Sequence, residues 1–146
     1  MSESERLAEV HRWLRYARED LVAAEAVLVQ EDVMPRHACW LAQQSAEKAL
    51  KAIFVYLQID FPRWHDLDAL RNRIPEGWSL KADHPDLSAL TEWAVEARYP
   101  GDWPEAVERD ARVAVEQARA IWHSVCRDLS EHGFEVSAAG GLSEPE

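Results

Sequence analysis

The stretch ACWLAQQSAEKALKAIFVYLQ, residues 38–58, decides the fold, because one helical period runs through all of it. At about 100° per residue, six apolar side chains fall on one arc of the helix: Ala42, Ala46, Ala49, Leu50, Ile53 and Leu57. The opposite arc carries a compact polar block with an aromatic residue on either side of it: Gln43, Gln44, Glu47, Lys48 and Lys51 between Trp40 and Phe54. The pattern predicts a helix that is buried on one side and mixed polar and aromatic on the other.

The polar block has three interpretations, which the sequence leaves open. Glu47 and Lys51 are spaced as an i,i+4 ion pair, which on a solvated helix is worth about 0.3 kcal/mol. The flanking Trp40 and Phe54 favour a polar group held inside an interface or at its rim. The third interpretation is a ligand site, and its candidates on this helix are Gln44, Glu47, Lys48 and Lys51.

Two more long helices follow from the same three-four spacing of apolar residues. The first covers residues 4–31, and Ser2 with Glu5 has the spacing of a capping box at its start, although Ser4 competes for the same role. Pro35 then suits the first turn of the helix that contains the opening stretch, since the missing N–H of proline has no partner there anyway.

The last long helix begins near Trp103–Pro104, and Gly133 is a natural C-cap for it. Two short helices between proline breakers come before it, one within residues 62–75 and one within residues 85–99. Three long helices and two short ones, without a convincing strand, predict an all-α, up-and-down bundle of about five helices.

The chain has 146 residues, 47% of them hydrophobic, which fits one domain with a substantial core. We place this helical domain at residues 1–133. Residues 134–146 have little to bury and contain several small, flexible residues. They are expected to form a flexible C-terminal tail.

Charge and composition exclude several classes of function. Sixteen Lys and Arg against 27 Asp and Glu give a net charge of -11, so the overall field repels nucleic acids and anionic membranes. The N-terminus has no signal-peptide core, and no apolar run reaches the length of a membrane span. Cys39 and Cys126 form no CxxC motif and no disulfide framework. We therefore predict a cytoplasmic protein that binds no membrane, no metal and no cofactor.

Four stretches, in their order and intervals, resemble the HEPN domain family, named for higher-eukaryote and prokaryote nucleotide binding: WLRYAREDLVAAEAVL, ACWLAQQSAEKALKAIF, HDLDAL and EARYPGDWPEA. The resemblance covers roughly residues 8–131. It implies a bundle of about five helices, frequently a homodimer. It also implies a prokaryotic protein that is often encoded beside a small nucleotidyltransferase.

Many members of this family are metal-independent ribonucleases with a motif of Arg, four to six residues and His. In such a motif arginine stabilises the charge of a phosphorane and histidine moves protons. Here only Arg6 to His11 and Arg127 to His132 have the spacing. Chance alone yields about 1.6 such pairs in a chain of this composition, and both lie away from the start of the last helix, where the family carries its motif.

Arg98, in RYPGDWPE, stands where the family motif belongs, but no histidine follows it at the required spacing. Its guanidinium either binds a phosphate or carboxylate, or pairs with Glu96 or Asp102 as a structural clamp. Tyr99 has the same two interpretations. His65 and Asp66 open the third helix, where capping is the simpler role and a phosphate site is the alternative.

The sequence therefore predicts a stand-alone, non-catalytic HEPN protein that forms a homodimer. Its expected partner is a minimal nucleotidyltransferase in a two-gene system of the toxin–antitoxin type, and nucleotide binding is a further expectation. The alternative is that the chain is the ribonuclease toxin of such a system, with RNA as its substrate. No catalytic residue is assigned. The full set of candidate nucleotide, phosphate or interface residues is Gln44, Glu47, Lys48, Lys51, His65, Arg98 and Tyr99.

Overall fold

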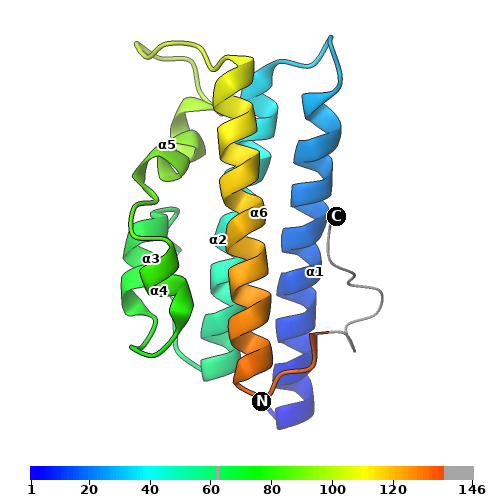
Figure 1. Cartoon of the computed structure of the whole chain (residues 1–146), viewed down its shortest axis with the longest axis vertical. Helices are drawn as coiled ribbons and strands as arrows, with labels where there is room; N and C mark the ends of the chain where they lie inside the picture. Colours follow the sequence, from blue (N-terminus) through cyan, green and yellow to red (C-terminus); the bar gives the residue numbers. More distant parts are fainter. Residues whose placement is uncertain (62, 137–146) are drawn as a thin grey trace.

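The computed structural model describes residues 1–61 and 63–136. All regular structure within these residues is helical. Three long helices run along the long axis of the molecule, and three short ones lie together along one side of them (Figure 1). The predicted all-α bundle is confirmed.

The long helices are α1 (Glu3–Leu28), α2 (Pro35–Leu57) and α6 (Glu108–Glu131). Helix α2 is central, because it packs against α1, α6 and the short helices α3 and α5. Six alanines on the facing sides of α2 and α6 are buried and allow these two helices to approach closely: Ala42, Ala46, Ala49, Ala111, Ala114 and Ala118.

The ends of the long helices follow local rules. The side chain of Ser2 caps α1 by accepting a hydrogen bond from Glu5 N at 3.1 Å, and Pro35 occupies the first turn of α2. Helix α2 stops at Gln58, which has φ 57° and closes the helix in the left-handed conformation. Gly133, with φ 96°, follows the end of α6.

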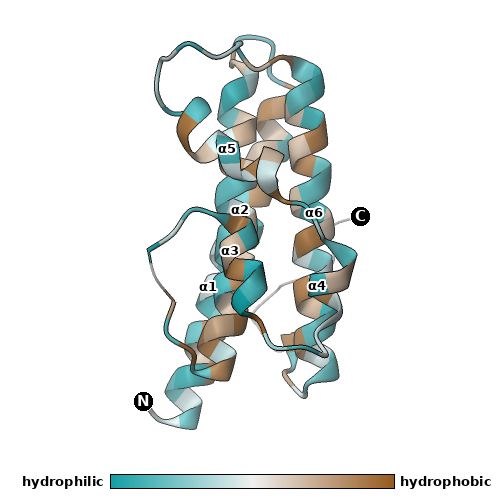
Figure 2. Ribbon diagram, turned by 90° about the vertical axis from the view of Figure 1, so that its left-hand side faces the viewer, coloured by the Kyte–Doolittle hydropathy of each residue, from teal (hydrophilic) through white to brown (hydrophobic). Residues whose placement is uncertain are grey.

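The short helices are α3 (Leu67–Arg73), α4 (Ser79–Asp83) and α5 (Ser88–Glu96), and they lie in front of α2 and α6 in Figure 2. The third helix appears where the sequence predicts it, and Asp66 caps it by accepting a hydrogen bond from Ala69 N at 3.1 Å. Helix α4 is additional to the predicted five. Its first turn is held by the buried carboxylate of Asp128 on α6, which accepts hydrogen bonds from Ser79 Oγ and, at 2.9 Å, from Leu80 N.

Two helices begin later than the sequence predicts, and in each a carboxylate binds the N–H of the residue before the first turn. Helix α5 starts at Ser88 rather than near residue 85, and Asp68 Oδ1 accepts a hydrogen bond from Leu87 N at 2.9 Å. Helix α6 starts at Glu108 rather than near Trp103, and Asp110 Oδ2 accepts one from Val107 N at 2.9 Å. The predicted turn between the two helices is thus a longer loop.

Packing continues past the predicted domain boundary at residue 133. The Phe134 side chain is 3% exposed, and its ring lies 4.6 Å from that of His11 and 5.9 Å from that of Tyr56. Val136 packs against the same core. The rest of the predicted tail, residues 137–146, lies outside the described residues.

We expect Asp128→Asn to lower the free energy of unfolding by about 2 kcal/mol, because hydrogen bonds to a buried charged acceptor are worth about 1.5–3 kcal/mol. The amide keeps one acceptor oxygen but turns an NH₂ group toward a donor. Urea denaturation monitored by circular dichroism measures the change. Asp83→Asn is the matched control, since Asp83 is exposed and pairs with Arg127 on the surface. An equal loss in both variants would contradict the capping role of Asp128.

Candidate functional site

Three residues of the polar block on α2 form an internally paired cluster with His65. Glu47 and Lys51 are buried, with their side chains only 7% and 8% exposed, and Lys51 Nζ lies 3.0 Å from Glu47 Oε2. The other oxygen, Glu47 Oε1, lies 2.7 Å from His65 Nδ1. Gln43 Nε2 donates to Glu47 Oε1 at 3.2 Å and to the carbonyl oxygen of His65 at 3.1 Å. We call these four residues the Glu47 cluster.

The electrostatics of the Glu47 cluster keep Glu47 ionised. Burial alone would raise the pKa of this carboxyl group, but the hydrogen bonds from His65 and Lys51, the charge of Lys51 and the hydrogen bond from Gln43 together lower it. The Lys51 ammonium also lies 5.4 Å from the centre of the Phe61 ring. Glu47 and Lys51 therefore satisfy each other and offer no unpaired charge to a ligand.

His65 carries the accessible atoms of the cluster. Its side chain is 53% exposed, and the backbone and Nδ1 contacts fix the orientation of the ring. When neutral His65 donates from Nδ1 to Glu47, its Nε2 is left as an acceptor. A carboxylate behind an imidazole is also common in catalytic sites, but the side chains hydrogen-bonded to this pair, Gln43 and Lys51, carry no hydroxyl or thiol nucleophile.

The remaining candidates on α2 lie outside the Glu47 cluster. Lys48 Nζ lies 2.5 Å from Asp20 Oδ2, so it ties α2 to α1. Gln44 is half-buried and donates to Gln43 Oε1 at 2.7 Å. The structure therefore brings together Glu47, Lys51 and His65, but not Lys48.

The two aromatic residues that flank the polar block differ in exposure. Phe54 is 1% exposed and packs against Phe61, with ring centres 5.8 Å apart, so it is covered within the chain and needs no second molecule to bury it. The connection between α2 and α3 covers it, which periodicity alone could not show. Trp40 is half-buried and lies beneath the guanidinium of Arg98, at 5.9 Å.

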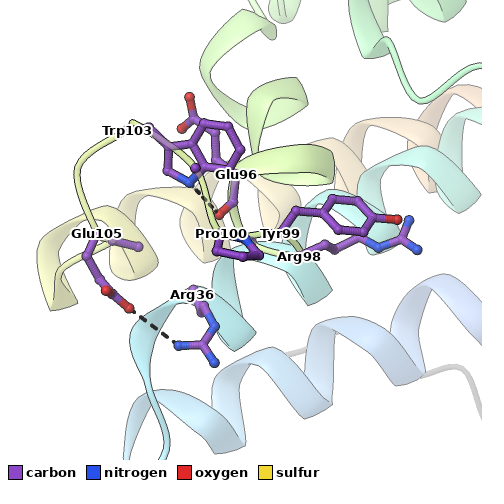
Figure 3. Close-up of a pocket in the computed structure, with 10 residues that line it drawn as sticks. Arg36, Glu96, Arg98, Tyr99, Pro100, Trp103 and Glu105 are labelled. Atoms are coloured by element: carbon purple, nitrogen blue, oxygen red, sulfur yellow. Dashed lines mark hydrogen bonds and ion pairs between the residues drawn. The ribbon is translucent and has the colours of Figure 1, made fainter.

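Arg98 and Tyr99 belong to a separate site, a cavity of about 430 Å³ beside the loop between α5 and α6. Figure 3 shows Trp103 and Glu105 on one side of Pro100, and Arg98 and Tyr99 extending on the other. Arg36, from the first turn of α2, closes the cavity from below in this view. We call this the Arg98 cavity.

The two guanidinium groups of the Arg98 cavity are only loosely engaged. Arg98 lies 5.1 Å from the ring centre of Tyr99 and forms no recorded ion pair with a carboxylate of residues 1–61 or 63–136, so the pairings with Glu96 and Asp102 are absent. Arg36 Nη1 lies 3.4 Å from Glu105 Oε1, and both side chains are exposed. An incoming anion could therefore reach both arginines without breaking a buried ion pair.

Glu96 and Trp103 shape the opposite wall. Burial, with a smaller effect of the neighbouring Glu92 charge, raises the pKa of Glu96. Trp103 Nε1 donates to the carbonyl oxygen of Glu96 at 3.1 Å. The indole lies so close to Gly101 that a Cβ atom there would stand 2.4 Å from ring carbons of Trp103. The lack of a side chain at Gly101 thus lets the ring approach the backbone closely.

We expect Gly101→Ala to push the Trp103 ring off the loop and to break its hydrogen bond to Glu96. Gly101 does not have a positive φ, so the effect is steric rather than conformational. The measurement is the indole N–H resonance of Trp103 in a ¹H–¹⁵N spectrum, which should shift or broaden. Asp102→Ala is the neighbouring control and should leave that resonance in place. An unchanged resonance in Gly101→Ala would contradict the packing.

Both arginine–histidine pairs with the ribonuclease spacing are held in structural contacts. Arg6 donates to the carbonyl oxygen of Tyr56, and the ring of His11 packs on Phe134. Arg127 Nη2 lies 2.6 Å from Asp83 Oδ2.

His132 is held from two directions. Its ring stacks on Trp78 at 3.8 Å, while its Nδ1 lies 2.8 Å from the carbonyl oxygen of Asp128. The contacts of both pairs, Arg6–His11 and Arg127–His132, are thus made with other parts of the chain.

Other chemistries find little support in the described part of the chain. No group of three or more His, Cys, Asp or Glu side chains there is placed to hold a metal ion. Burial, and secondarily the charge of Asp110, raise the pKa of the Cys39 thiol to about 12, which keeps it protonated and unreactive near neutral pH. None of the helices in this part is long and apolar enough to cross a membrane.

Sequence reasoning missed Arg36, Trp103 and Glu105 as partners of Arg98 in one cavity. Arg36 lies one turn before Trp40 on α2, so its place beside Arg98 follows from the Trp40–Arg98 contact. That contact depends on how α5 packs against α2. No pattern within a few residues of Arg36 or Arg98 predicts this packing.

Comparisons with known proteins agree with this fold. No curated protein matches the chain. Among solved structures, the crystal structure of TT1696 from Thermus thermophilus is similar, with a TM-score of 0.70 and 25% sequence identity over 82% of this chain and 98% of that chain. The model of the HEPN domain matches residues 10–129. That match takes in α2, the Glu47 cluster and the Arg98 cavity, and the chain belongs to the HEPN domain family.

Proposed function

We propose that this HEPN protein is non-catalytic and acts by binding. It forms a homodimer in the cytoplasm, partners a nucleotidyltransferase-type protein in a two-gene system of the toxin–antitoxin type, and takes a nucleotide in the Arg98 cavity. The observation that carries the proposal is that Arg98 stands in a cavity whose ten lining residues include no histidine.

The absence of histidine from that lining supports binding over RNA cleavage. Cleavage at a 2′-hydroxyl needs a group that takes a proton and a group that gives one, and arginine does neither at physiological pH. The other ionisable groups in the lining are Glu96, Tyr99 and Glu105, and none of them is an imidazole, which is the proton carrier of the family motif. The cavity is therefore better suited to hold an anion than to transform it.

The chemistry of the cavity favours a nucleotide over a simple anion. Arg36 and Arg98 supply forked donors for a phosphate, while the rings of Tyr99 and Trp103 supply surfaces on which a base can stack. The volume of about 430 Å³ lies within the range of small-molecule sites. Two arginines face two glutamates, so a monophosphate matches the local charge better than a triphosphate does.

Calorimetry with AMP, GMP, ATP and GTP tests the binding proposal, and the expected result is tighter binding of the monophosphates. Purified protein incubated with structured and single-stranded RNA should leave both intact, and expression in a host should leave growth unchanged. RNA cleavage would instead support the ribonuclease alternative. Co-purification with the protein encoded by an adjacent nucleotidyltransferase-type gene tests the partner.

A further inference from the structure

Helix α2 has one side that other helices leave partly uncovered. In Figure 1, α6 lies in front of α2, while α1 and the short helices lie on either side of it. A strip of half-buried residues follows α2 on another side: Trp40, Gln44, Lys48 and Val55. Their spacing of four, four and seven residues keeps them on one line of the helix.

The neighbouring side of α1 extends this strip with aromatic residues. Tyr16 is 49% exposed, and Trp13 is half-buried against the edge of the Phe61 ring at 5.8 Å. A groove of about 280 Å³ between the two helices is lined by Glu9, Arg12, Trp13, Tyr16 and Lys48. We call Trp13, Tyr16, Trp40, Gln44 and Lys48 the α1–α2 face.

We propose that the α1–α2 face is the interface through which two copies of this chain pair. The proposal deepens the proposed function, because it rests on the homodimer and names the surface that forms it. Tyr16 of each copy enters the groove beside Trp13 and Lys48 of the other copy. The two α1–α2 pairs then form a four-helix arrangement about a two-fold axis.

Charge on the face favours a second copy as its occupant. The chain carries a net charge of -11, so most contacts between copies are repulsive. Around the groove, however, Arg12 Nε lies 2.7 Å from Glu9 Oε1, and Lys48 Nζ lies 2.5 Å from Asp20 Oδ2. These two acidic and two basic side chains give the groove no net charge. Because the surface carries both signs, positive groups of one copy can meet negative groups of the other across a two-fold axis.

The extent of the two helices is comparable with that of a stable protein–protein interface. A helix of the length of α2 extends about 35 Å, and two adjacent helices are about 20 Å wide. The outline of the two helices is thus about 700 Å², comparable in extent with the roughly 800 Å² per partner that a standard stable interface buries. Tyrosine and tryptophan at its centre are the residue types that contribute most to binding energy.

The test uses the full chain in sedimentation-velocity experiments over a range of micromolar concentrations. Wild-type protein should be a dimer. Tyr16→Glu should raise the dimer dissociation constant by at least about 100-fold, because each interface contains two copies of the change. Val22→Glu is the matched control: Val22 lies on the same helix, is 47% exposed, and by the helical period stands about 120° around the helix from Tyr16. It should leave the dissociation constant within about three-fold.

Arg12→Glu is the second variant, since it alters an exposed charge on the face without touching the core. It should also dissociate the dimer, and high salt should restore part of the affinity. A wild-type monomer overturns both the homodimer and the face. A wild-type dimer that persists unchanged in Tyr16→Glu and Arg12→Glu overturns the face alone, and so does equal dissociation in Val22→Glu. Circular dichroism of each variant checks that it is folded.

Discussion

Replacing Glu47 with leucine is expected to lower the free energy of unfolding by about 3–5 kcal/mol, the cost of leaving a buried charge without its partner. Lys51 is 7% exposed and would lose its only recorded carboxylate among the described residues. His65 would lose the acceptor that fixes its ring. Urea denaturation of the full chain, followed by circular dichroism, measures the loss.

A double variant separates the burial of charge from the loss of packing. In Glu47→Leu with Lys51→Met, both charges are gone and the volume is roughly kept, so most of the lost stability should return. Asp20→Asn is the control for a less buried pair, because Lys48 and Asp20 are 25% and 20% exposed. It should cost at most about 1 kcal/mol. A double variant as unstable as Glu47→Leu would contradict this account of the cluster.

The pH dependence of this effect has a definite sign. The folded state lowers the pKa of Glu47 below its ordinary value of 4.5, so the contribution of the ionised carboxylate is complete above pH 4.5. It is lost as the pH falls through the lower pKa of the folded state. The stability difference between wild type and Glu47→Leu should therefore shrink in acid, while a constant difference would point to packing instead.

The helices that the sequence predicts well are those whose causes are local. The apolar period of α2, the Ser2 cap and Pro35 all act within a few residues. Helix α4 escaped prediction because its cap, Asp128, lies 48 residues further along the chain. The start of α5 is likewise marked by a residue distant in sequence, since Asp68 of α3 accepts a hydrogen bond from Leu87 N.

The same distinction applies to the candidate residues. The Glu47–Lys51 pair follows from i,i+4 spacing, but its burial does not, because residues after α2 cover it. His65 binds Glu47, whereas Lys48 pairs with Asp20 on α1. The position of His65 depends on the path of the chain between α2 and α3, which the sequence does not show. The Trp40 and Phe54 pattern predicted one shared surface. Phe54 is instead covered within the chain and Trp40 meets Arg98.

Replacing Arg98 with alanine is expected to weaken the binding of a nucleoside monophosphate about 30- to 150-fold. Charge-assisted hydrogen bonds from a guanidinium to phosphate are worth about 2–3 kcal/mol. Arg98 donates to no carboxylate recorded among residues 1–61 and 63–136, so its removal leaves no recorded acid unpaired and should leave stability nearly unchanged. Calorimetry with AMP and GMP, beside thermal denaturation, measures the two effects.

Three further variants make this result specific to the Arg98 cavity. Arg98→Lys keeps the charge but not the forked donor, so its affinity should fall between those of wild type and Arg98→Ala. Arg36→Ala should weaken binding less, because Arg36 already shares its guanidinium with Glu105. Arg112→Ala removes an exposed arginine of α6 that lies outside the cavity lining and should change nothing. Equal weakening by Arg98→Ala and Arg112→Ala would show that only the general charge of the chain matters, and the Arg98 cavity would not be the binding site.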